Sequence, residues 1–249
     1  MSNIVFKTVL SLVIWPFVFM SFLIGGTVLL ILMVFIHPHH LTPIKRFIST
    51  LILLSSGVLL EVKGKKNVNP NKCYIWMLNH QSFLDVFIIM ATIPQYAVGV
   101  EAVHHFKWPL WGWIIRRWGN IPIDRLNLNK AIESIEKAKE VLNNGTSIMI
   151  APEGTRTITG ELMPFKKGPF HLALGTKAEI LPVGIQGTFN VKNKTDWRIT
   201  PGRVTVRIGK PISYKDYKDM SVEVLRDFVR TKIQVLSGDI KKSTTVSLK

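Results

Sequence analysis

The chain begins with a hydrophobic stretch that is much longer than any other in its 249 residues. From Thr8 to Ile36, 29 consecutive residues carry no charge, and about 20 are enough for a helix to cross the core of a bilayer. A second uncharged stretch, Phe47–Leu60, has 14 residues, and the histidines and prolines between residues 37 and 43 are typical of a loop. The pattern predicts a membrane-embedded helical hairpin over residues 1–62. The alternative is a pair of apolar helices buried in a soluble core.

Beyond residue 62 the pattern changes to short runs rich in β-branched and aromatic residues, separated by stretches with helical periodicity. Apolar residues within Asn129–Asn143 recur at spacings of four, three and four positions, which predicts an amphipathic helix with Asn129 as its N-cap. A second helix is expected over Ser221–Leu236. The expected strands are Cys73–Leu78, Tyr96–Val100, Ser147–Ile150, Ile180–Ile185 and Val204–Ile208.

Strands that alternate with helices predict an α/β fold with a mostly parallel sheet flanked by helices. We therefore expect three parts: the two-helix anchor over residues 1–62, a globular domain over residues 63–236, and a polar, flexible tail over residues 237–249. In sheets of this type, ligands bind outside the carboxyl ends of the strands. Polar loops that directly follow the strands are therefore the first candidates for a site.

Charge narrows the class of partner. Lys and Arg number 32 against 16 Asp and Glu, a net charge of +16, in a chain that is also hydrophobic on average. This combination favours attraction to an anionic membrane surface, and nucleic acid is the other common partner of a basic protein. The one cysteine, Cys73, excludes an intramolecular disulfide and fits a reducing compartment. The sequence has no HExxH, CxxC, GxGxxG or P-loop motif, so no metal site is predicted.

The segment NHQSFLD places His80 and Asp85 directly after an expected strand. A histidine can take a proton from a hydroxyl, and a carboxylate on its other nitrogen fixes the tautomer and stabilises the imidazolium. Five residues along a straight helix set two side chains about 140° apart. The two can meet only if His80 lies in the turn and Asp85 in the first helical turn. On these residues alone, Asp85 could equally be a helix cap.

Two further loops carry groups suited to a phosphate or carboxylate. After the strand Ser147–Ile150 come Glu153, Gly154, Thr155 and Arg156, which offer a close backbone approach, a hydroxyl and a guanidinium fork. Glu153 could position Arg156 or bind a substrate hydroxyl. The segment GNIPIDR ends in Arg125, which could instead pair with Asp124 or Glu133. Taken singly, each loop could also be an ordinary surface turn.

Four blocks stand in a fixed order: NHQSFLD at residues 79–85, GNIPIDR at 119–125, APEGTR at 151–156 and ILPVGIQGT at 180–188. Together they closely resemble the glycerophospholipid acyltransferase family, above all its bacterial 1-acyl-sn-glycerol-3-phosphate (lysophosphatidic acid) acyltransferases. The resemblance covers about Lys63 to Ile212, and the N-terminal hairpin is similar as well. It makes residues 63–236 an acyltransferase catalytic domain.

The resemblance implies that an acyl group passes from acyl-CoA or acyl carrier protein to the sn-2 hydroxyl of 1-acyl-glycerol 3-phosphate, which makes phosphatidic acid. It implies that His80 is the general base and that Asp85 orients it. Arg125 and the loop of Glu153, Gly154, Thr155 and Arg156 would hold the glycerol phosphate, and Leu181 and Pro182 would help to shape the acyl site. No metal or cofactor is expected. The domain would face the cytoplasm, beside an anionic membrane.

The sequence departs from the family pattern in one place that matters for the acceptor. Where the family often has a Lys-Glu-Leu element, this chain has Val103, His104 and His105. The alternative acceptor is therefore another lysophospholipid or a lyso-ornithine lipid. A third interpretation, which rests on charge alone, is a basic membrane-associated scaffold or nucleic-acid binder without enzyme activity. The leading interpretation expects no nucleic-acid partner.

Overall fold

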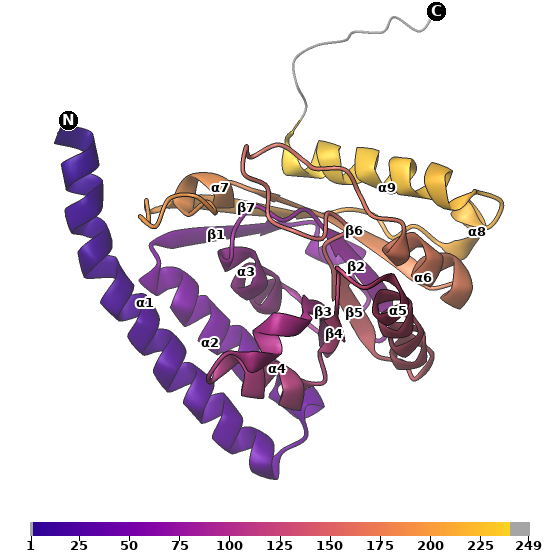
Figure 1. Cartoon of the computed structure of the whole chain (residues 1–249), viewed down its shortest axis with the longest axis horizontal. Coiled ribbons are helices and arrows are strands. Elements are labelled where there is room, and N and C mark those ends of the chain that lie inside the picture. The colour runs from indigo at the N-terminus through magenta and orange to yellow at the C-terminus, as the bar shows by residue number, and fades with distance from the viewer. Residues whose placement is uncertain (1, 240–249) are drawn as a thin grey trace, which may run out of the picture.

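The computed structural model describes residues 2–239, and its centre is a seven-stranded sheet (Figure 1). Its strands are β1 (Val58–Lys63), β2 (Tyr74–Leu78), β3 (Ala97–Ala102), β4 (Ile121–Ile123), β5 (Ser147–Ile150), β6 (Glu179–Gln186) and β7 (Gly202–Ile208). They lie in the order β1-β7-β6-β2-β5-β3-β4. Neighbouring strands run parallel except β6 and β7. The mostly parallel sheet expected from the sequence is confirmed.

Helices cover both faces of this sheet (Figure 1). One face carries α5 (Leu128–Asn143), α6 (Gly168–Thr176) and α9 (Val222–Ser237), and the other carries α2 (Thr42–Ser55) and α3 (Leu84–Thr92). The long helix α1 (Ser2–Phe35) lies outermost, against α2 and α4 (Trp111–Trp118). Two short helices, α7 (Thr188–Val191) and α8 (Tyr214–Tyr217), lie in the connections that flank β7.

Strand β2 shows why the central strands are continuous hydrophobic runs in the sequence. All five of its residues are buried. Ile75 and Met77 belong to the core beneath α5, α6 and α9, whereas Trp76 and Leu78 belong to the core beneath α2 and α3. Because successive side chains in a strand point to opposite faces, a strand covered on both sides must be apolar at every position. The polar segment that begins at Asn79 therefore marks the point where the chain leaves the sheet.

Two strands and one helix cap differ from the sequence expectations. Strand β4 has only three residues, too few to give a periodic pattern. Strand β1 begins within the second uncharged stretch, so its apolar residues could not be told apart from that stretch in the sequence. The predicted boundary between the anchor and the globular domain, after residue 62, falls within this strand. The side chain of Asn127, not Asn129, caps α5 by accepting a hydrogen bond from Lys130 N. Ser221 is the N-cap of α9, so the helix starts at Val222, one residue after the expected start.

The expected hairpin is present as a pair of packed helices. Its first arm, α1, has 34 residues, and Ile4–Phe35 is the one helix of residues 2–239 long and apolar enough to cross a membrane. The second arm, α2, has 14 residues and packs against α3 with Ser49, Ile52 and Leu53 buried. It is therefore part of the globular fold. The first three residues of the expected tail are described, and residues 240–249 lie outside the described part.

Gly184 lies where the end of α9 crosses β6, and we expect it to be essential for that contact. A Cβ at this position would overlap backbone atoms of Leu236 and Ser237. We predict that Gly184→Ala lowers the free energy of unfolding by roughly 1–3 kcal/mol, because overpacking forces backbone shifts. Gly202→Ala in the neighbouring strand is the matched control, since its Cβ would make only ordinary contacts. Thermal unfolding in detergent compares the two, and equal midpoints would refute the prediction.

Candidate active site

His80 and Asp85 meet at the carboxyl end of β2, with His80 in the turn and Asp85 in the first turn of α3. His80 Nδ1 lies 2.9 Å from Asp85 Oδ2. The Asp85 side chain is 1% exposed and that of His80 is 21% exposed. The turn-and-helix arrangement is the one that the five-residue spacing required. The histidine therefore reaches the surface while its carboxylate partner stays buried.

A single oxygen of Asp85 organises the whole turn. Asp85 Oδ2 also accepts hydrogen bonds from Gln81 N at 2.6 Å and Ser82 N at 2.7 Å. With this carboxylate ionised, the proton of the neutral imidazole lies on Nδ1, which donates to Asp85. His80 Nε2 is then left as an acceptor. Such an arrangement can hold a base in a defined tautomer and can stabilise the positive charge that follows protonation.

Glu153 joins this turn to the loop after β5. Its Oε1 accepts a hydrogen bond from His80 N at 2.6 Å, and its Oε2 accepts one from Met163 N at 2.8 Å. The side chain is buried, which raises its pKa to about 7, against the opposing effect of these two backbone N–H groups. Both oxygens are engaged with backbone donors. We therefore propose that Glu153 positions His80 and does not contact a substrate.

Further hydrogen bonds fix the neighbours of His80. The Asn79 side chain donates to Ile185 O at 2.9 Å and accepts from Ile185 N at 2.7 Å, which ties the end of β2 to β6. Ser82 Oγ donates to Lys192 O at 2.5 Å. These roles were missed in the sequence, although both residues lie within the motif. Their partners are more than 100 positions away, so no local pattern could reveal them.

The loop after β5 presents the predicted phosphate ligands beside His80. Thr157 N donates to His80 O at 3.0 Å, which holds the adjacent Arg156 close to the catalytic turn. Gly154 adopts a positive φ of 72°, so the sharp turn here favours glycine. Thr155 Oγ1 accepts a hydrogen bond from Lys194 Nζ at 3.4 Å. Among residues 2–239, none forms a hydrogen bond or ion pair with the Arg156 guanidinium.

Arg125 lies at the same edge of the sheet, beyond β4, together with His104. Ala102 of β3 is paired with Ile123 of the parallel strand β4. His104 comes two residues after Ala102 and Arg125 comes two residues after Ile123, so both residues leave the sheet at the same edge. His104 is exposed, and slight desolvation together with the charges of His105 and Arg125 lowers its pKa. The side chains of the described residues offer Arg125 no hydrogen bond or ion pair, and neither Asp124 nor Glu133 pairs with it. The edge thus presents a second unpaired guanidinium.

The long N-terminal helix reaches the site through one aromatic contact. Trp15 of α1 stacks on Phe83, with ring centroids 5.9 Å apart and an interplanar angle of 14°. Lys192 Nζ also lies over the Phe83 ring, 5.8 Å from its centroid. Phe83 is only two residues before Asp85. The position of α1 is therefore coupled mechanically to the segment that carries His80 and Asp85.

The remaining expectations fall on buried positions or on metal chemistry. Leu181 and Pro182, expected to shape an acyl site, lie inside β6, where both are buried and Pro182 is paired with Met77. No group of three or more His, Cys, Asp or Glu side chains within residues 2–239 is arranged to hold a metal ion. The described site thus consists of a histidine with a buried carboxylate partner, and loops at the same edge of the sheet carry Arg125 and Arg156. Such a set can deprotonate a hydroxyl on a molecule that carries an anionic group.

Comparison with known proteins agrees with this chemistry. The family model described as acyltransferase matches residues 59–186, about half of the chain. The structure resembles the crystal structure of the 1-acyl-sn-glycerophosphate acyltransferase of Thermotoga maritima, with a TM-score of 0.83 and 22% sequence identity, over 96% of this chain and 99% of that one. At this identity the likeness establishes the fold.

Relatives similar in sequence carry one name, 1-acyl-sn-glycerol-3-phosphate acyltransferase. The protein of Cocos nucifera is 36% identical over 67% of this chain and 54% of its own length. That of Limnanthes alba is 34% identical over 74% of this chain and 64% of its own. That of Saccharomyces cerevisiae is 37% identical over 64% of this chain and 54% of its own. The chain thus spans 54 to 64% of the length of these relatives.

Glu153 gives the site a defined pH dependence of stability. Its pKa rises from 4.5 to about 7 on folding, so the native state binds this proton more tightly than the unfolded chain does. Raising the pH through this interval therefore destabilises the fold. We predict that wild type loses roughly 2.5 kcal/mol relative to Glu153→Gln between pH 5 and pH 8.

Thermal unfolding of both proteins across this pH range measures the difference. Glu140→Gln, which removes an exposed carboxylate from α5, is the matched control and should run parallel to wild type. Parallel curves for wild type and Glu153→Gln would show that the Glu153 carboxyl is not perturbed.

Proposed function

Because the chain belongs to the acyltransferase family, we propose that it transfers an acyl group from a thioester to the sn-2 hydroxyl of 1-acyl-glycerol 3-phosphate, making phosphatidic acid. The donor is acyl-CoA or acyl carrier protein. The observation that carries the proposal is the hydrogen bond between His80 Nδ1 and Asp85 Oδ2, at an edge of the sheet whose loops also carry Arg125 and Arg156. The shared name of the relatives supports this choice of acceptor.

In this mechanism His80 Nε2 takes the proton of the acceptor hydroxyl as the oxygen attacks the thioester carbonyl. Asp85 stabilises the imidazolium that forms. The tetrahedral intermediate then collapses, the carbon–sulfur bond breaks, and the imidazolium returns its proton to the departing thiolate. General base catalysis of this kind contributes about 10²- to 10⁴-fold. The steps need no side-chain nucleophile, and Ser82 is engaged by the carbonyl of Lys192.

The acceptor phosphate is assigned to the cations around His80, in line with the sequence analysis. We propose that the loop of Gly154, Thr155 and Arg156 binds it, with Arg125 as the second guanidinium. Arginine suits this task because its planar fork matches phosphate oxygens and keeps its charge at every physiological pH. Glu153 supports the same loop from within.

Another lysophospholipid, or a lyso-ornithine lipid, is the second candidate acceptor. The observation that favours it is the placement of His104 beside Arg125, because a histidine there makes the local charge dependent on pH. Slight desolvation and the charges of His105 and Arg125 lower the pKa of His104, which favours its neutral form. A less anionic head group would tolerate that environment better than a phosphate monoester.

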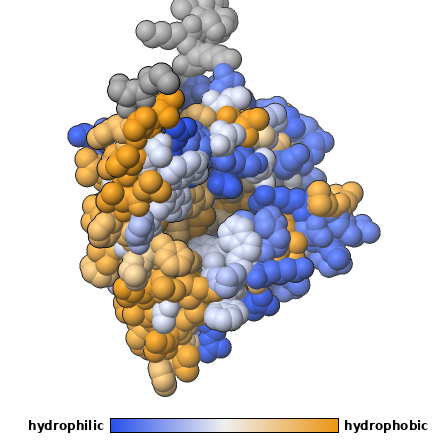
Figure 2. Space-filling model, turned by 60° about the vertical axis from the view of Figure 1, so that its left-hand side comes forward, coloured by the Kyte–Doolittle hydropathy of each residue, from blue (hydrophilic) through white to orange (hydrophobic). Residues whose placement is uncertain are grey.

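We further propose that the protein is membrane-bound through α1. Fifteen large apolar side chains of this helix are exposed: Ile4, Val5, Phe6, Val9, Leu12, Val13, Phe17, Phe19, Met20, Leu23, Ile24, Val28, Ile31, Val34 and Phe35. Figure 2 shows apolar residues gathered along one side of the molecule, with a hollow between them and a hydrophilic side. An apolar surface of this extent is unfavourable in water and favourable in lipid.

The contacts of α1 favour an orientation along the membrane surface, within one leaflet. In the first half of α1, Trp15 Nε1 donates to Trp197 O at 3.0 Å. Near its end, Arg117 donates to Met33 O at 3.0 and 3.2 Å. These contacts lie about 27 Å apart along a helix, close to the ~30 Å thickness of the hydrocarbon core. A spanning α1 would draw the polar domain into the bilayer. Because thioester carriers are cytosolic, we place the domain on the cytoplasmic side.

The enzymatic proposal predicts that purified protein acylates 1-acyl-glycerol 3-phosphate, and that His80→Ala lowers kcat by about 10³-fold or more, because the base is lost. The measurement is an acceptor screen with one labelled acyl-CoA, repeated with acyl carrier protein. Unfolding midpoints verify that the variant is folded. Substantial activity of folded His80→Ala would remove the assignment of the base.

The same screen separates the candidate functions. Preferred acylation of a different lysolipid would favour the second acceptor. No acyl transfer to any lysolipid, combined with salt-sensitive binding of DNA or RNA, would favour a basic binding protein without this activity.

The orientation proposal predicts that both ends of α1 lie on the side of the membrane that holds the domain. The single native cysteine makes this measurable in a Cys73→Ala background. Lys7→Cys and His40→Cys, reconstituted in sealed vesicles, should react with a membrane-impermeant maleimide to the same extent as Lys210→Cys, the reference in the globular domain. Labelling of the two helix ends from opposite sides would establish a spanning helix instead.

A further inference from the structure

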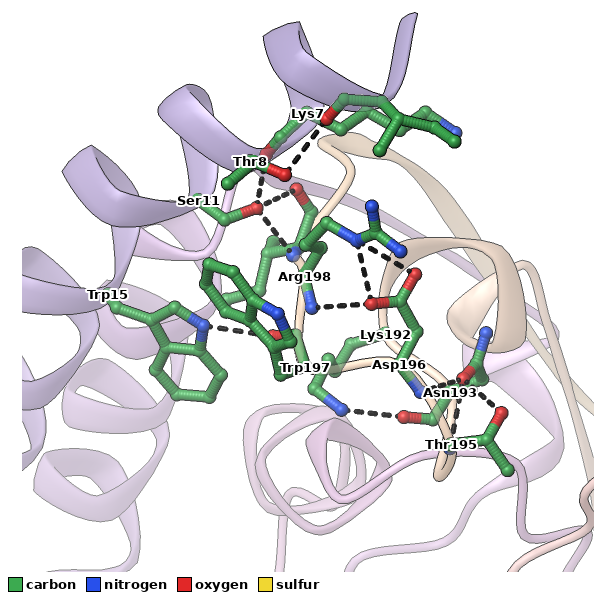
Figure 3. Close-up of polar contacts among 12 residues, drawn as sticks. Lys7, Thr8, Ser11, Trp15, Lys192, Asn193, Thr195, Asp196, Trp197 and Arg198 are labelled. Carbon is green, nitrogen blue, oxygen red and sulfur yellow. Dashed lines mark hydrogen bonds and ion pairs between the residues drawn. The ribbon is translucent and has the colours of Figure 1, made fainter. Parts of the chain in front are cut away.

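Lys192 is a buried lysine held directly against the segment that carries the proposed base. Its side chain and backbone are 8% exposed together, and its carbonyl accepts the hydrogen bond from Ser82 Oγ at 2.5 Å. It follows β6 through α7, outside the four sequence blocks. Lys192 Nζ donates to Asn193 O at 2.6 Å (Figure 3). It also lies over the Phe83 ring, 5.8 Å from its centroid. Sequence position gives no hint of this proximity.

The Lys192 ammonium is incompletely satisfied by the protein. An ammonium group has three N–H donors, and within residues 2–239 only Asn193 O accepts one of them. Unpaired donors on a buried cation are costly, so such a group needs a further acceptor. An anion bound at this point would supply acceptors and charge together.

A second cation lies near enough to Lys192 to repel it. Burial and the charge of Arg156 lower the pKa of Lys192, while Asp196 opposes this effect. The Asp196 carboxylate is already engaged, because it accepts hydrogen bonds from Arg198 Nε at 2.9 and 3.2 Å (Figure 3). The loops of Lys192 and Arg156 meet at Lys194, whose Nζ donates to Thr155 Oγ1 at 3.4 Å. Two like charges from separate loops therefore act on each other, and the carboxylate that opposes this repulsion is already paired with Arg198. Two neighbouring positive charges of this kind attract an anion to the position between them.

The fold holds both cations rigidly close to His80. The loop that bears Lys192 is fastened to α1 by Ser11 (Figure 3). Ser11 Oγ accepts a hydrogen bond from Ile199 N at 3.0 Å and lies 3.2 Å from Ile199 O. Ser82 fastens the same loop to the catalytic turn. On the other side, Thr157 N holds the Arg156 loop through His80 O. Both loops are therefore fastened to the turn that carries His80.

We propose that Lys192 and Arg156 together bind the phosphate of the acceptor lipid, with Lys192 as a head-group-recognising residue. The assignment rests on the proposed function. In a glycerol phosphate, only two carbons and one ester oxygen separate the sn-2 hydroxyl oxygen from phosphorus, so the phosphate must lie beside the base. The phosphates of a thioester carrier lie at the far end of a long pantetheine arm. The pair tied to the His80 turn therefore suits the acceptor.

The test compares Lys192→Met with Lys210→Met, which removes the same charge from an exposed position after β7. We expect Lys192→Met to raise KM for 1-acyl-glycerol 3-phosphate by about 10- to 100-fold, the loss of one charge-assisted hydrogen bond. KM for the acyl donor should not change. The preference for this acceptor over the phosphate-free monoacylglycerol should fall by a similar factor. Lys192→Arg should retain most of the preference, and Lys210→Met all of it.

Two additions keep the outcome decisive. Lys192→Gln removes the charge but keeps an N–H donor for Asn193 O. This variant is measured instead of Lys192→Met if Lys192→Met does not fold. Titration calorimetry with glycerol 3-phosphate reports binding without turnover. If wild type binds it in a Lys192-dependent manner but acylates no lysophosphatidate, the anion site stands and the proposed function fails. If wild type is active and folded Lys192 variants behave like Lys210→Met, or if donor KM rises instead, the inference is overturned.

Discussion

The site depends on one buried carboxylate oxygen. Asp85 Oδ2 accepts hydrogen bonds from two consecutive backbone N–H groups and lies 2.9 Å from His80 Nδ1. The backbone bonds shape the turn between β2 and α3, and the imidazole contact sets the tautomer within that turn. Removing the carboxylate would therefore disturb the shape of the turn as well as the chemistry of the histidine. This dual use explains why the aspartate is buried while its partner stays accessible.

The parallel sheet turns this local arrangement into a site. Strands β2, β5 and β6 are neighbours with the same direction, so their carboxyl ends deliver three loops to one edge. Glu153 and Asn79 then connect these loops across the edge through backbone N–H and C=O groups. The cost is a buried carboxyl whose pKa is raised to about 7. The edge is thus rigid before any ligand arrives, which is what preorganised chemistry requires.

The sequence predicts those parts of the structure that depend on local pattern. Three such features depend only on residues that are close together in the sequence. They are the β-rich runs, the polar segments after β2 and β5, and the geometric condition under which His80 and Asp85 can meet. Contacts between distant segments could not be predicted in this way. Glu153 could not be assigned to His80 N, nor Lys192 to Ser82, because each depends on which loops the sheet brings together. Strand β1 was hidden because its apolar residues continue the preceding stretch.

The apolar helix α1 and the cations of the site lie close together, and one physical interpretation accounts for both. Trp15 connects the apolar helix α1 to Phe83, and Ser11 fastens that helix to the loop that bears Lys192. A substrate with an apolar chain and an anionic head needs both surfaces within one molecular length. In water, the exposed face of α1 and the repulsion between Arg156 and Lys192 are both unfavourable. Under the proposed function, a lipid bilayer would relieve the first and an anionic head group the second, so a lipid with an anionic head group would satisfy both.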